Sequence, residues 1–241
     1  MTVFTLPYAV GNSTAFTKFK WYLERNLDNV TVINLDYPGH GTRFTETLCK
    51  KIEDIARDMY IQMNRNEQFQ LGNYSIVGYS MGSIVCHEIL QILKRNKKSM
   101  PKCVLFMACD APGFEPLFTD CLSYDTDDVK RILRTEGGTP KEVLECSELI
   151  EVLKDIVRCD YFAIETYRTN LDSVDENTFA ETNFYVIRGN EETYDERLLH
   201  RWDSFYGGKI VYRTLPGKHF FLFENGENLA AVCEILKEVI I

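Results

Sequence analysis

The sequence predicts an α/β fold, in which a mostly parallel β-sheet is flanked by helices, and three observations support this prediction. Short apolar runs alternate with longer segments that have helical periodicity. Most of the runs lack the strict polar–apolar alternation of a half-solvated strand, which favours strands buried on both faces. A serine flanked by glycines stands between one such run and the helical segment after it. Strands and helices that alternate in this way predict a parallel sheet covered on both faces.

Six segments rich in Val, Ile, Phe, Tyr or Leu are the expected strands. They are Val3–Pro7, Val30–Asp36, Ser75–Gly78, Cys103–Ala108, Phe184–Arg188 and Lys209–Leu215. The helices expected between them cover residues 14–27, 46–69, 81–97, 194–206 and 226–240. The second helix carries Leu48, Ile52, Ile55, Met59 and Met63 at spacings of three and four, which places them on one apolar face.

Residues 112–178 interrupt the alternation, because they contain helical patterns but no convincing strand. Three helices are expected there: Leu122–Thr135, Lys141–Val157 and Arg158–Thr169. An insertion of this size between two strands is expected to form a helical lid that shapes a substrate site. The alternative interpretation is additional helical packing.

Length, composition and charge limit the class of protein. A chain of 241 residues with 45% hydrophobic and 12% aromatic residues is expected to form one globular domain over residues 1–241, and a monomer. No apolar run reaches the roughly 18–20 residues that cross a bilayer, and the first residues carry no secretory signal, so a cytoplasmic location is expected. The net charge of −9 argues against a nucleic-acid partner.

The eight cysteines are scattered and form no Cys-x-x-Cys pair, so buried free thiols are expected rather than a disulfide framework. The four histidines have no cysteine or carboxylate at metal-ligand spacing. We therefore expect neither a metal nor an organic cofactor.

The sharpest motif is Gly78-Tyr79-Ser80-Met81-Gly82, which follows an expected strand and precedes an expected helix. This is the setting of a nucleophile elbow, in which a sharp turn presents the serine hydroxyl at the carboxyl end of the sheet. The same turn directs the Met81 N–H, at a helix N-terminus, toward an oxyanion. Ser80 is the predicted nucleophile.

The second oxyanion donor is expected in the loop after the first strand, at the backbone N–H of Ala9. Gly11 is expected to allow a tight path there, before Ser13 or Thr14 caps the next helix.

A serine nucleophile needs a base, and His219 is the predicted one because it lies after the last strand, where this fold places its histidine. His87 is expected to pack inside the helix after the elbow and His200 to be solvated, whereas His40 lies in the loop after the second strand.

The acid that orients the base is expected in the loop after the strand Phe184–Arg188, and Glu192 is the first choice. Asp110, at the end of the preceding strand, is the rival, and Asp195 and Glu191 are further alternatives.

Four motifs besides the elbow resemble the type II thioesterases that accompany nonribosomal peptide and polyketide assembly lines, which have the α/β-hydrolase fold. They are Leu6-Pro7-Tyr8-Ala9, Pro38-Gly39-His40-Gly41-Thr42-Arg43, Arg158-Cys159-Asp160-Tyr161 together with Gly137-Gly138-Thr139-Pro140, and Gly217-Lys218-His219-Phe220-Phe221-Leu222. The resemblance covers nearly the whole chain. Two residues depart from it, since Val10 stands where the family usually has a glycine and Glu192 where it usually has an aspartate.

The resemblance implies a serine hydrolase that removes acyl groups from the phosphopantetheine arm of acyl or peptidyl carrier proteins. Carrier proteins are usually acidic, so an enzyme with a net charge of −9 needs a local basic surface, for which Lys94–Lys98 or Arg131 with Arg134 are candidates. The alternative functions are a small-molecule carboxylesterase that uses the same triad and an inactive scaffold that binds carrier proteins.

Overall fold

The computed structural model describes residues 1–112, 120–168, 179–192, 196–206 and 210–240. These residues form a six-stranded parallel sheet with the order β2-β1-β3-β4-β5-β6. Its strands are β1 (Thr2–Leu6), β2 (Thr31–Asn34), β3 (Tyr74–Tyr79), β4 (Cys103–Met107), β5 (Asn183–Gly189) and β6 (Ile210–Leu215). All six predicted strands are confirmed, with bounds within two residues of the prediction, although Lys209 lies outside the described residues.

The central strands are buried on both faces, which is why their sequences are continuously apolar. Side chains still alternate between two hydrophobic clusters. Ile76 of β3 joins the cluster on one face, and its neighbour Val77 joins the cluster on the other. The sheet therefore separates two cores rather than bordering one.

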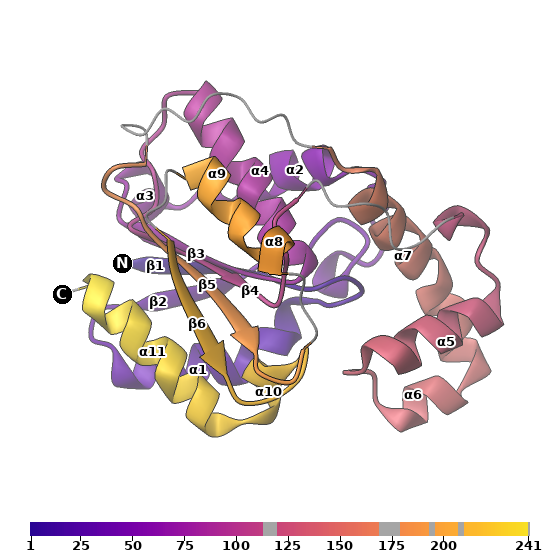
Figure 1. The fold of residues 1–241 in the computed structure, drawn as a ribbon. Helices are drawn as coiled ribbons and strands as arrows, with labels where there is room; N and C mark the ends of the chain where they lie inside the picture. The colour runs from indigo at the N-terminus through magenta and orange to yellow at the C-terminus, as the bar shows by residue number, and fades with distance from the viewer. Residues whose placement is uncertain (113–119, 169–178, 193–195, 207–209, 241) are drawn as a thin grey trace.

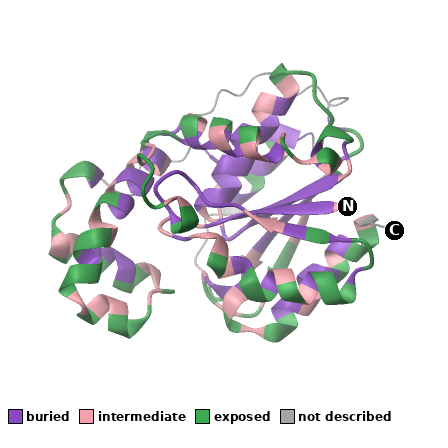
Figure 2. Ribbon diagram, turned by 180° about the vertical axis from the view of Figure 1, so that it is seen from behind, coloured by how far each residue is buried: buried purple, intermediate pink, exposed green. Residues whose placement is uncertain are grey.

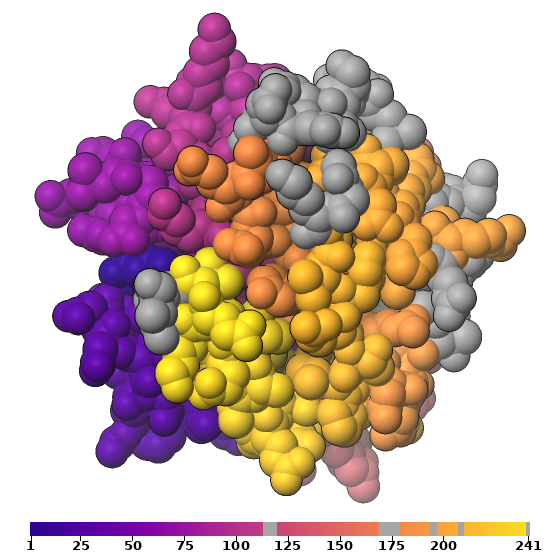
Figure 3. Space-filling view, turned by 60° about the vertical axis from the view of Figure 1, so that its left-hand side comes forward, coloured from indigo at the N-terminus to yellow at the C-terminus, as the bar shows by residue number. Residues whose placement is uncertain are grey.

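Helices cover both faces of the sheet (Figure 1). One layer contains α2 (Ile52–Met63), α3 (Glu67–Gln70), α4 (Met81–Arg95), α8 (Glu196–Leu199) and α9 (Asp203–Tyr206). The other layer contains α1 (Thr17–Asn26), α10 (Phe221–Glu224) and α11 (Gly226–Ile240). Helix α1 packs beside α11, so the N-terminal and C-terminal parts of the chain lie side by side on the face shown in Figure 3. The helices bury their inner sides and expose their outer sides (Figure 2). None of the described helices is both long and apolar enough to cross a membrane.

The prediction of one helix over 46–69 is wrong in two places, because α2 begins only at Ile52 and the chain breaks again before α3. Arg43 binds Glu46 and Asp58, both at 2.5 Å, which holds the segment before α2 as a loop. At the second break, the Asn66 side chain accepts a hydrogen bond from the Phe69 N–H at 3.2 Å and starts α3.

The insertion contains α5 (Thr126–Glu136), α6 (Lys141–Glu145) and α7 (Ser147–Thr166), and it lies on the side of the molecule away from the termini (Figure 1). The predicted boundary between Val157 and Arg158 is wrong. The chain turns at Cys146 instead, where the backbone is extended, and α7 continues through the Asp155–Arg158 ion pair. Buried residues of α5 and α7 form a third hydrophobic cluster, so the insertion has its own core.

All eight cysteines are free, as predicted, and five of them are buried: Cys86, Cys103, Cys121, Cys159 and Cys233. Cys86 illustrates their chemical state, because burial raises the pKa of its thiol well above the usual value. These thiols therefore act as small apolar side chains of the core.

Asp36, just after β2, ties two loops to the carboxyl end of the sheet. Its buried carboxylate accepts hydrogen bonds from the backbone N–H and hydroxyl of both Ser13 and Thr42, at 2.6–3.0 Å. Burial alone would raise the pKa of Asp36, but these hydrogen bonds outweigh it and hold the pKa below its usual value of 3.8. A Cβ at Gly41 would lie 2.4 Å from the carboxylate, so this position is restricted to glycine.

We expect Asp36→Asn to lower the free energy of unfolding by about 2 kcal/mol at neutral pH, because charge-assisted hydrogen bonds become neutral or are lost. A carboxyl group whose pKa is lower in the folded than in the unfolded state stabilises the protein at pH values above its unfolded-state pKa. This stabilisation is lost as the pH falls through its folded-state pKa. The difference between the variant and the parent protein should therefore shrink below pH 3.8. Denaturant titrations at several pH values measure this difference, with the exposed Asp28→Asn as the control. A difference independent of pH would contradict the interpretation.

Candidate active site

Ser80 occupies a strained turn between β3 and α4. Its backbone has φ 51° and ψ −118°, a sparsely populated region that costs on the order of 1–3 kcal/mol. The Ser80 N–H donates to the Met107 carbonyl at 2.8 Å, which anchors the turn to β4. Met81 is the first residue of α4, so its N–H belongs to the helix N-terminus.

The glycines on either side of Ser80 are required by close backbone contacts. A Cβ at Gly78 would lie 2.4 Å from the Gly82 carbonyl oxygen, and a Cβ at Gly82 would lie 2.1 Å from the Leu6 carbonyl oxygen. Any larger residue would separate α4 from β1 and β3. The motif therefore marks the place where the helix backbone packs directly on the sheet.

The side chains of His219 and Glu192 are in direct contact although 27 residues separate them. The His219 Nδ1 lies 2.7 Å from the Glu192 Oε1, and the other carboxylate oxygen accepts the Gly189 N–H at 2.9 Å. Since Nδ1 donates to the carboxylate, Nε2 is the ring nitrogen that can accept a proton. The two side chains are 26% and 10% exposed, so the pair is shielded yet reachable.

Backbone contacts between two loops hold this pair in place. Asn190 and Glu191 after β5 make hydrogen bonds of 2.8 and 3.0 Å to Leu215 and Gly217 after β6. A Cβ at Gly189 would lie 2.3 Å from the Gly217 carbonyl oxygen, so these loops approach as closely as backbones can.

The alternatives to Glu192 have different positions. Glu191 is exposed and donates its backbone N–H to Gly217. Asp110 stands three residues beyond the end of β4, and Asp195 lies outside the described residues. The observed partner of His219 is Glu192.

Two other histidines have the positions expected of them. His87 is fully buried, its Nδ1 lies 2.7 Å from the Tyr206 hydroxyl, and burial lowers its pKa to about 3, so it is a neutral core residue. His200 is exposed and lies 3.4 Å from Asp203.

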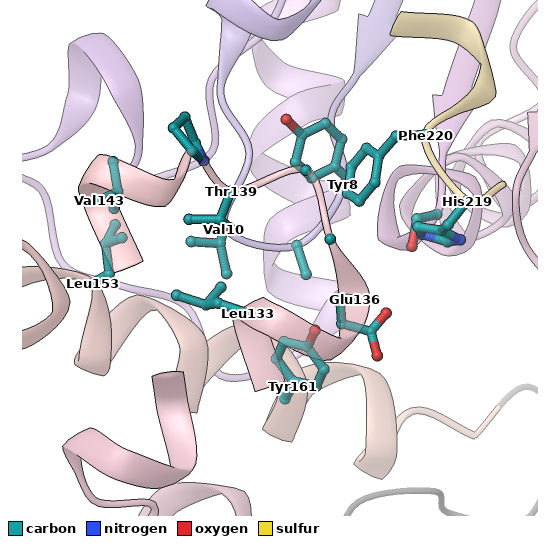
Figure 4. A pocket seen from close by; sticks show the side chains of 15 residues that line it. Tyr8, Val10, Leu133, Glu136, Thr139, Val143, Leu153, Tyr161, His219 and Phe220 are labelled. Atoms are coloured by element: carbon teal, nitrogen blue, oxygen red, sulfur yellow. The ribbon is translucent and has the colours of Figure 1, made fainter. Parts of the chain in front are cut away.

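Ser80, His219 and Ala9 line one pocket of about 210 Å³. Its other wall comes from the helical insertion, which contributes Leu133, Glu136, Val143, Leu153 and Tyr161 (Figure 4). The sheet and the insertion therefore enclose the serine between them. In the described part of the chain, no group of three or more His, Cys, Asp or Glu side chains is arranged to hold a metal ion.

Val10, the neighbour of Ala9, carries the backbone strain in the loop after β1. Its φ is 66°, a left-handed conformation that is unusual for a β-branched residue. Gly11 allows the tight path, as expected, because a Cβ there would lie 2.8 Å from the Tyr8 carbonyl oxygen. The expected caps Ser13 and Thr14 are wrong: Asn12 is the cap and accepts the Thr14 N–H.

Asp160 of α7 holds this strained loop, a role that the sequence analysis missed. Its Oδ2 accepts the Val10 N–H at 2.7 Å and lies 3.0 Å from the His40 Nε2. Asp160 and His40 each belong to one of the motifs described above, but nothing in their separation of 120 residues signals the contact. The cluster of half-buried Val10 with buried His40 and Asp160 joins the insertion to the sheet.

The contacts of His40 in this cluster favour its imidazolium form. Its Nδ1 faces the Pro38 carbonyl at 3.1 Å and its Nε2 faces the Asp160 carboxylate, and since both partners accept hydrogen bonds, both ring nitrogens donate. Burial alone would lower the pKa of His40, but the charges of Asp160 and Asp36 and the hydrogen bonds raise it above its usual value of 6.5.

A parallel sheet, a serine in a strained strand–helix turn and a histidine after the last strand define the α/β-hydrolase fold. Residues 1–240 match the family model described as "Thioesterase domain", and the chain belongs to this family. It is a thioesterase, an enzyme that hydrolyses thioester bonds, as the resemblance predicted.

Relatives in sequence agree with this assignment, and a solved structure shares the fold. The chain is 24% identical to the gramicidin S biosynthesis protein GrsT of Aneurinibacillus migulanus, over 100% of this chain and 90% of that protein. It is 27% identical to the thioesterase PikA5 of Streptomyces venezuelae, over 90% and 74% of the two chains. Among solved structures, ClbQ from the colibactin NRPS/PKS pathway has a TM-score of 0.84 at 23% identity, with 99% and 97% of the two chains covered.

The His40–Asp160 pair makes a prediction about stability. We expect Asp160→Ala to lower the free energy of unfolding by about 3 kcal/mol near pH 6, because it leaves a buried charge on His40 and an unpaired Val10 N–H. A histidine whose pKa is higher in the folded than in the unfolded state stabilises the protein at pH values below its unfolded-state pKa. This stabilisation is lost as the pH rises through its folded-state pKa. The cost of the variant should therefore decrease as the pH is raised above 6.5.

Denaturant titrations from about pH 6 to about pH 9 measure this effect. Asp203→Ala, which removes the partly exposed partner of the exposed His200, is the matched control and should change stability little at either pH. An Asp160→Ala cost that stays constant across this range would show that His40 is not the titrating partner.

Proposed function

We propose that Ser80, His219 and Glu192 form the catalytic triad of an enzyme that hydrolyses acyl thioesters on the phosphopantetheine arm of carrier proteins. The observation that carries the proposal is the 2.7 Å contact between His219 and Glu192, at the wall of the same pocket in which the strained turn presents Ser80.

The proposed reaction has two halves. In the first, the His219 Nε2 takes the hydroxyl proton as the Ser80 Oγ attacks the thioester carbonyl carbon. The backbone N–H groups of Met81 and Ala9 hold the negative oxygen of the tetrahedral intermediate, the carbon–sulfur bond breaks, and the thiolate receives the proton from His219. In the second half, His219 takes a proton from water as the water oxygen attacks the acyl carbon. The bond between this carbon and the Ser80 Oγ then breaks, His219 returns the proton to Oγ, and the carboxylic acid is released. Every proton transfer uses His219, so the scheme requires no metal and no organic cofactor.

Glu192 has two effects in this scheme. Its carboxylate fixes the tautomer of His219 and stabilises the imidazolium that forms when the ring takes the proton. The extra methylene of glutamate relative to aspartate is accommodated, because the second carboxylate oxygen is held by the Gly189 N–H.

The names of the relatives support carrier-bound substrates in nonribosomal peptide or polyketide biosynthesis, in the editing role of a type II thioesterase. GrsT is named for gramicidin S biosynthesis, and ClbQ for an NRPS/PKS pathway. We propose that this chain acts in such a pathway, in the cytoplasm and as a monomer, and that the insertion is a lid over the acyl group.

The carrier protein is proposed to dock on the basic side of α5. Arg131 and Arg134 are exposed there, on the helix whose Leu133 lines the pocket. Lys94–Lys98 are less suitable, because they lie at the far end of α4, whose 15 residues extend about 22 Å from Ser80.

We expect Ser80→Ala and His219→Ala each to lower kcat by at least about a thousandfold on an acyl-carrier thioester, because each removes a group that forms or breaks a bond. Glu192→Gln should lower kcat by about a hundredfold or more, since the neutral amide no longer stabilises the imidazolium. Stopped-flow or thiol-release assays measure these rates, and Glu191→Gln is the matched control. A Glu192→Gln variant as active as the control would remove Glu192 from the triad.

Two experiments distinguish the proposed thioesterase from the inactive scaffold and the small-molecule carboxylesterase. One labels the active-site serine with a fluorophosphonate, and the other compares rates on ester and thioester substrates. Labelling in the parent protein that disappears in Ser80→Ala excludes the inactive scaffold. A higher kcat/KM for p-nitrophenyl esters than for acyl-carrier thioesters would favour the small-molecule carboxylesterase and contradict the proposal.

The docking proposal is tested by reversing charge. Arg131→Glu with Arg134→Glu should raise the KM for an acyl-carrier thioester by roughly tenfold, because two favourable contacts of about 0.5–1 kcal/mol each become repulsive. The KM for the corresponding N-acetylcysteamine thioester should not change. Lys97→Glu with Lys98→Glu, at the far end of α4, is the matched control. An equal effect on both substrates would place the arginines outside the docking surface.

A further inference from the structure

Glu136 places a carboxylate inside a pocket that is otherwise lined mainly by apolar and small residues. It is the last residue of α5 and lines the pocket together with Ser80, His219 and Tyr161. Within the described residues, Glu136 contributes the one carboxylate of this lining, and no lysine or arginine takes part in it. In the view of Figure 4, the Glu136 side chain is drawn between Tyr161 and His219.

The structure gives Glu136 no role in holding the insertion together. Across the described part of the chain, its carboxylate makes neither a hydrogen bond nor an ion pair, whereas Asp128 on the same helix is bound to Arg131 at 2.6 Å. Its position at the C-terminus of α5 is also unfavourable for a negative charge, because the helix dipole is negative there. A carboxylate that stabilises neither its helix nor its neighbours is available to a ligand.

The surroundings of Glu136 favour a cation. The carboxylate and the C-terminal carbonyl groups of α5 are negative at the same wall of the pocket. Burial and the Glu136 charge both raise the pKa of Tyr161, which keeps the hydroxyl of this neighbour neutral and does not offset the negative charge. Partial enclosure between the sheet and the insertion strengthens attraction to a positive group relative to open water.

We propose that Glu136 is a specificity residue that binds a protonated amine on the acyl group, so that the enzyme prefers aminoacyl and other amine-bearing thioesters to alkanoyl thioesters of the same length. The pocket of about 210 Å³ is smaller than the roughly 300–1,000 Å³ of pockets for drug-sized ligands, which favours a short acyl group. Acyl groups that end in a carboxylate are disfavoured by the same charge. This inference rests on the proposed function, because it takes Ser80 as the residue that attacks in this pocket.

The test compares thioesters that differ only in the amine. Propionyl is matched with alanyl and butyryl with 4-aminobutyryl, all as N-acetylcysteamine thioesters, and succinyl serves as the anionic substrate. We expect the parent protein to favour at least one amine-bearing member of a pair by about tenfold in kcat/KM, the size of one charge-assisted hydrogen bond. Glu136→Gln should bring that ratio close to one, and Glu136→Lys should favour succinyl over the amine-bearing substrates.

Glu142→Gln is the matched control, because it makes the same charge change on an exposed residue of the insertion outside the pocket. It should retain the ratio of the parent protein, and thermal unfolding checks that all variants are folded. Equal rates within both pairs for the parent protein, or a ratio that survives in Glu136→Gln, would overturn the inference and leave the proposed function intact. No turnover of any thioester, with no labelling of Ser80, would overturn the proposed function and this inference with it.

Discussion

The close packing of the α4 backbone on the end of β1 is the constraint from which the geometry of the site follows. Gly82 has no side chain, and a Cβ at this position would lie 2.1 Å from the Leu6 carbonyl oxygen. This contact brings the N-terminus of α4 beside the loop that continues from β1. As a result, Ala9 lines the same pocket as Ser80, and the turn between β3 and α4 must be sharp enough to strain the Ser80 backbone.

The insertion is coupled to this geometry through Asp160. One carboxylate oxygen binds both the strained Val10 N–H and the His40 ring, so a helix of the insertion supports the conformation of the loop after β1. The hydrophobic cluster of the insertion also packs against Ala9 and Val10. The pocket wall and the loop next to the serine therefore depend on one another, and movement of α7 would release the restraint on Val10.

Local patterns were sufficient to predict the strands and to single out Ser80, His219 and Ala9, which line one pocket. They failed where a long-range contact decides the local structure. The segment before α2 has a helical pattern, yet the Arg43 contacts with Glu46 and Asp58 hold it as a loop. The boundary inside the insertion fell at Cys146 because packing between α5 and α7, rather than a breaker residue, determines where the chain turns. In the same way, the backbone strain in the loop after β1 lies at Val10 and not at Gly11, because the carboxylate of Asp160, distant in sequence, binds the Val10 N–H.

The sequence by itself determined the alternation of strands and helices, the elbow around Ser80 and the place of His219 after the last strand, because these depend on short-range periodicity and on glycine in a tight turn. Only the tertiary structure decided which carboxylate meets His219, which residue supports the loop after β1, and that Glu136 lines the same pocket as Ser80. Each of these depends on contacts between segments far apart in the chain, whose register and approach are set by the packing of the sheet and the insertion and leave no local pattern.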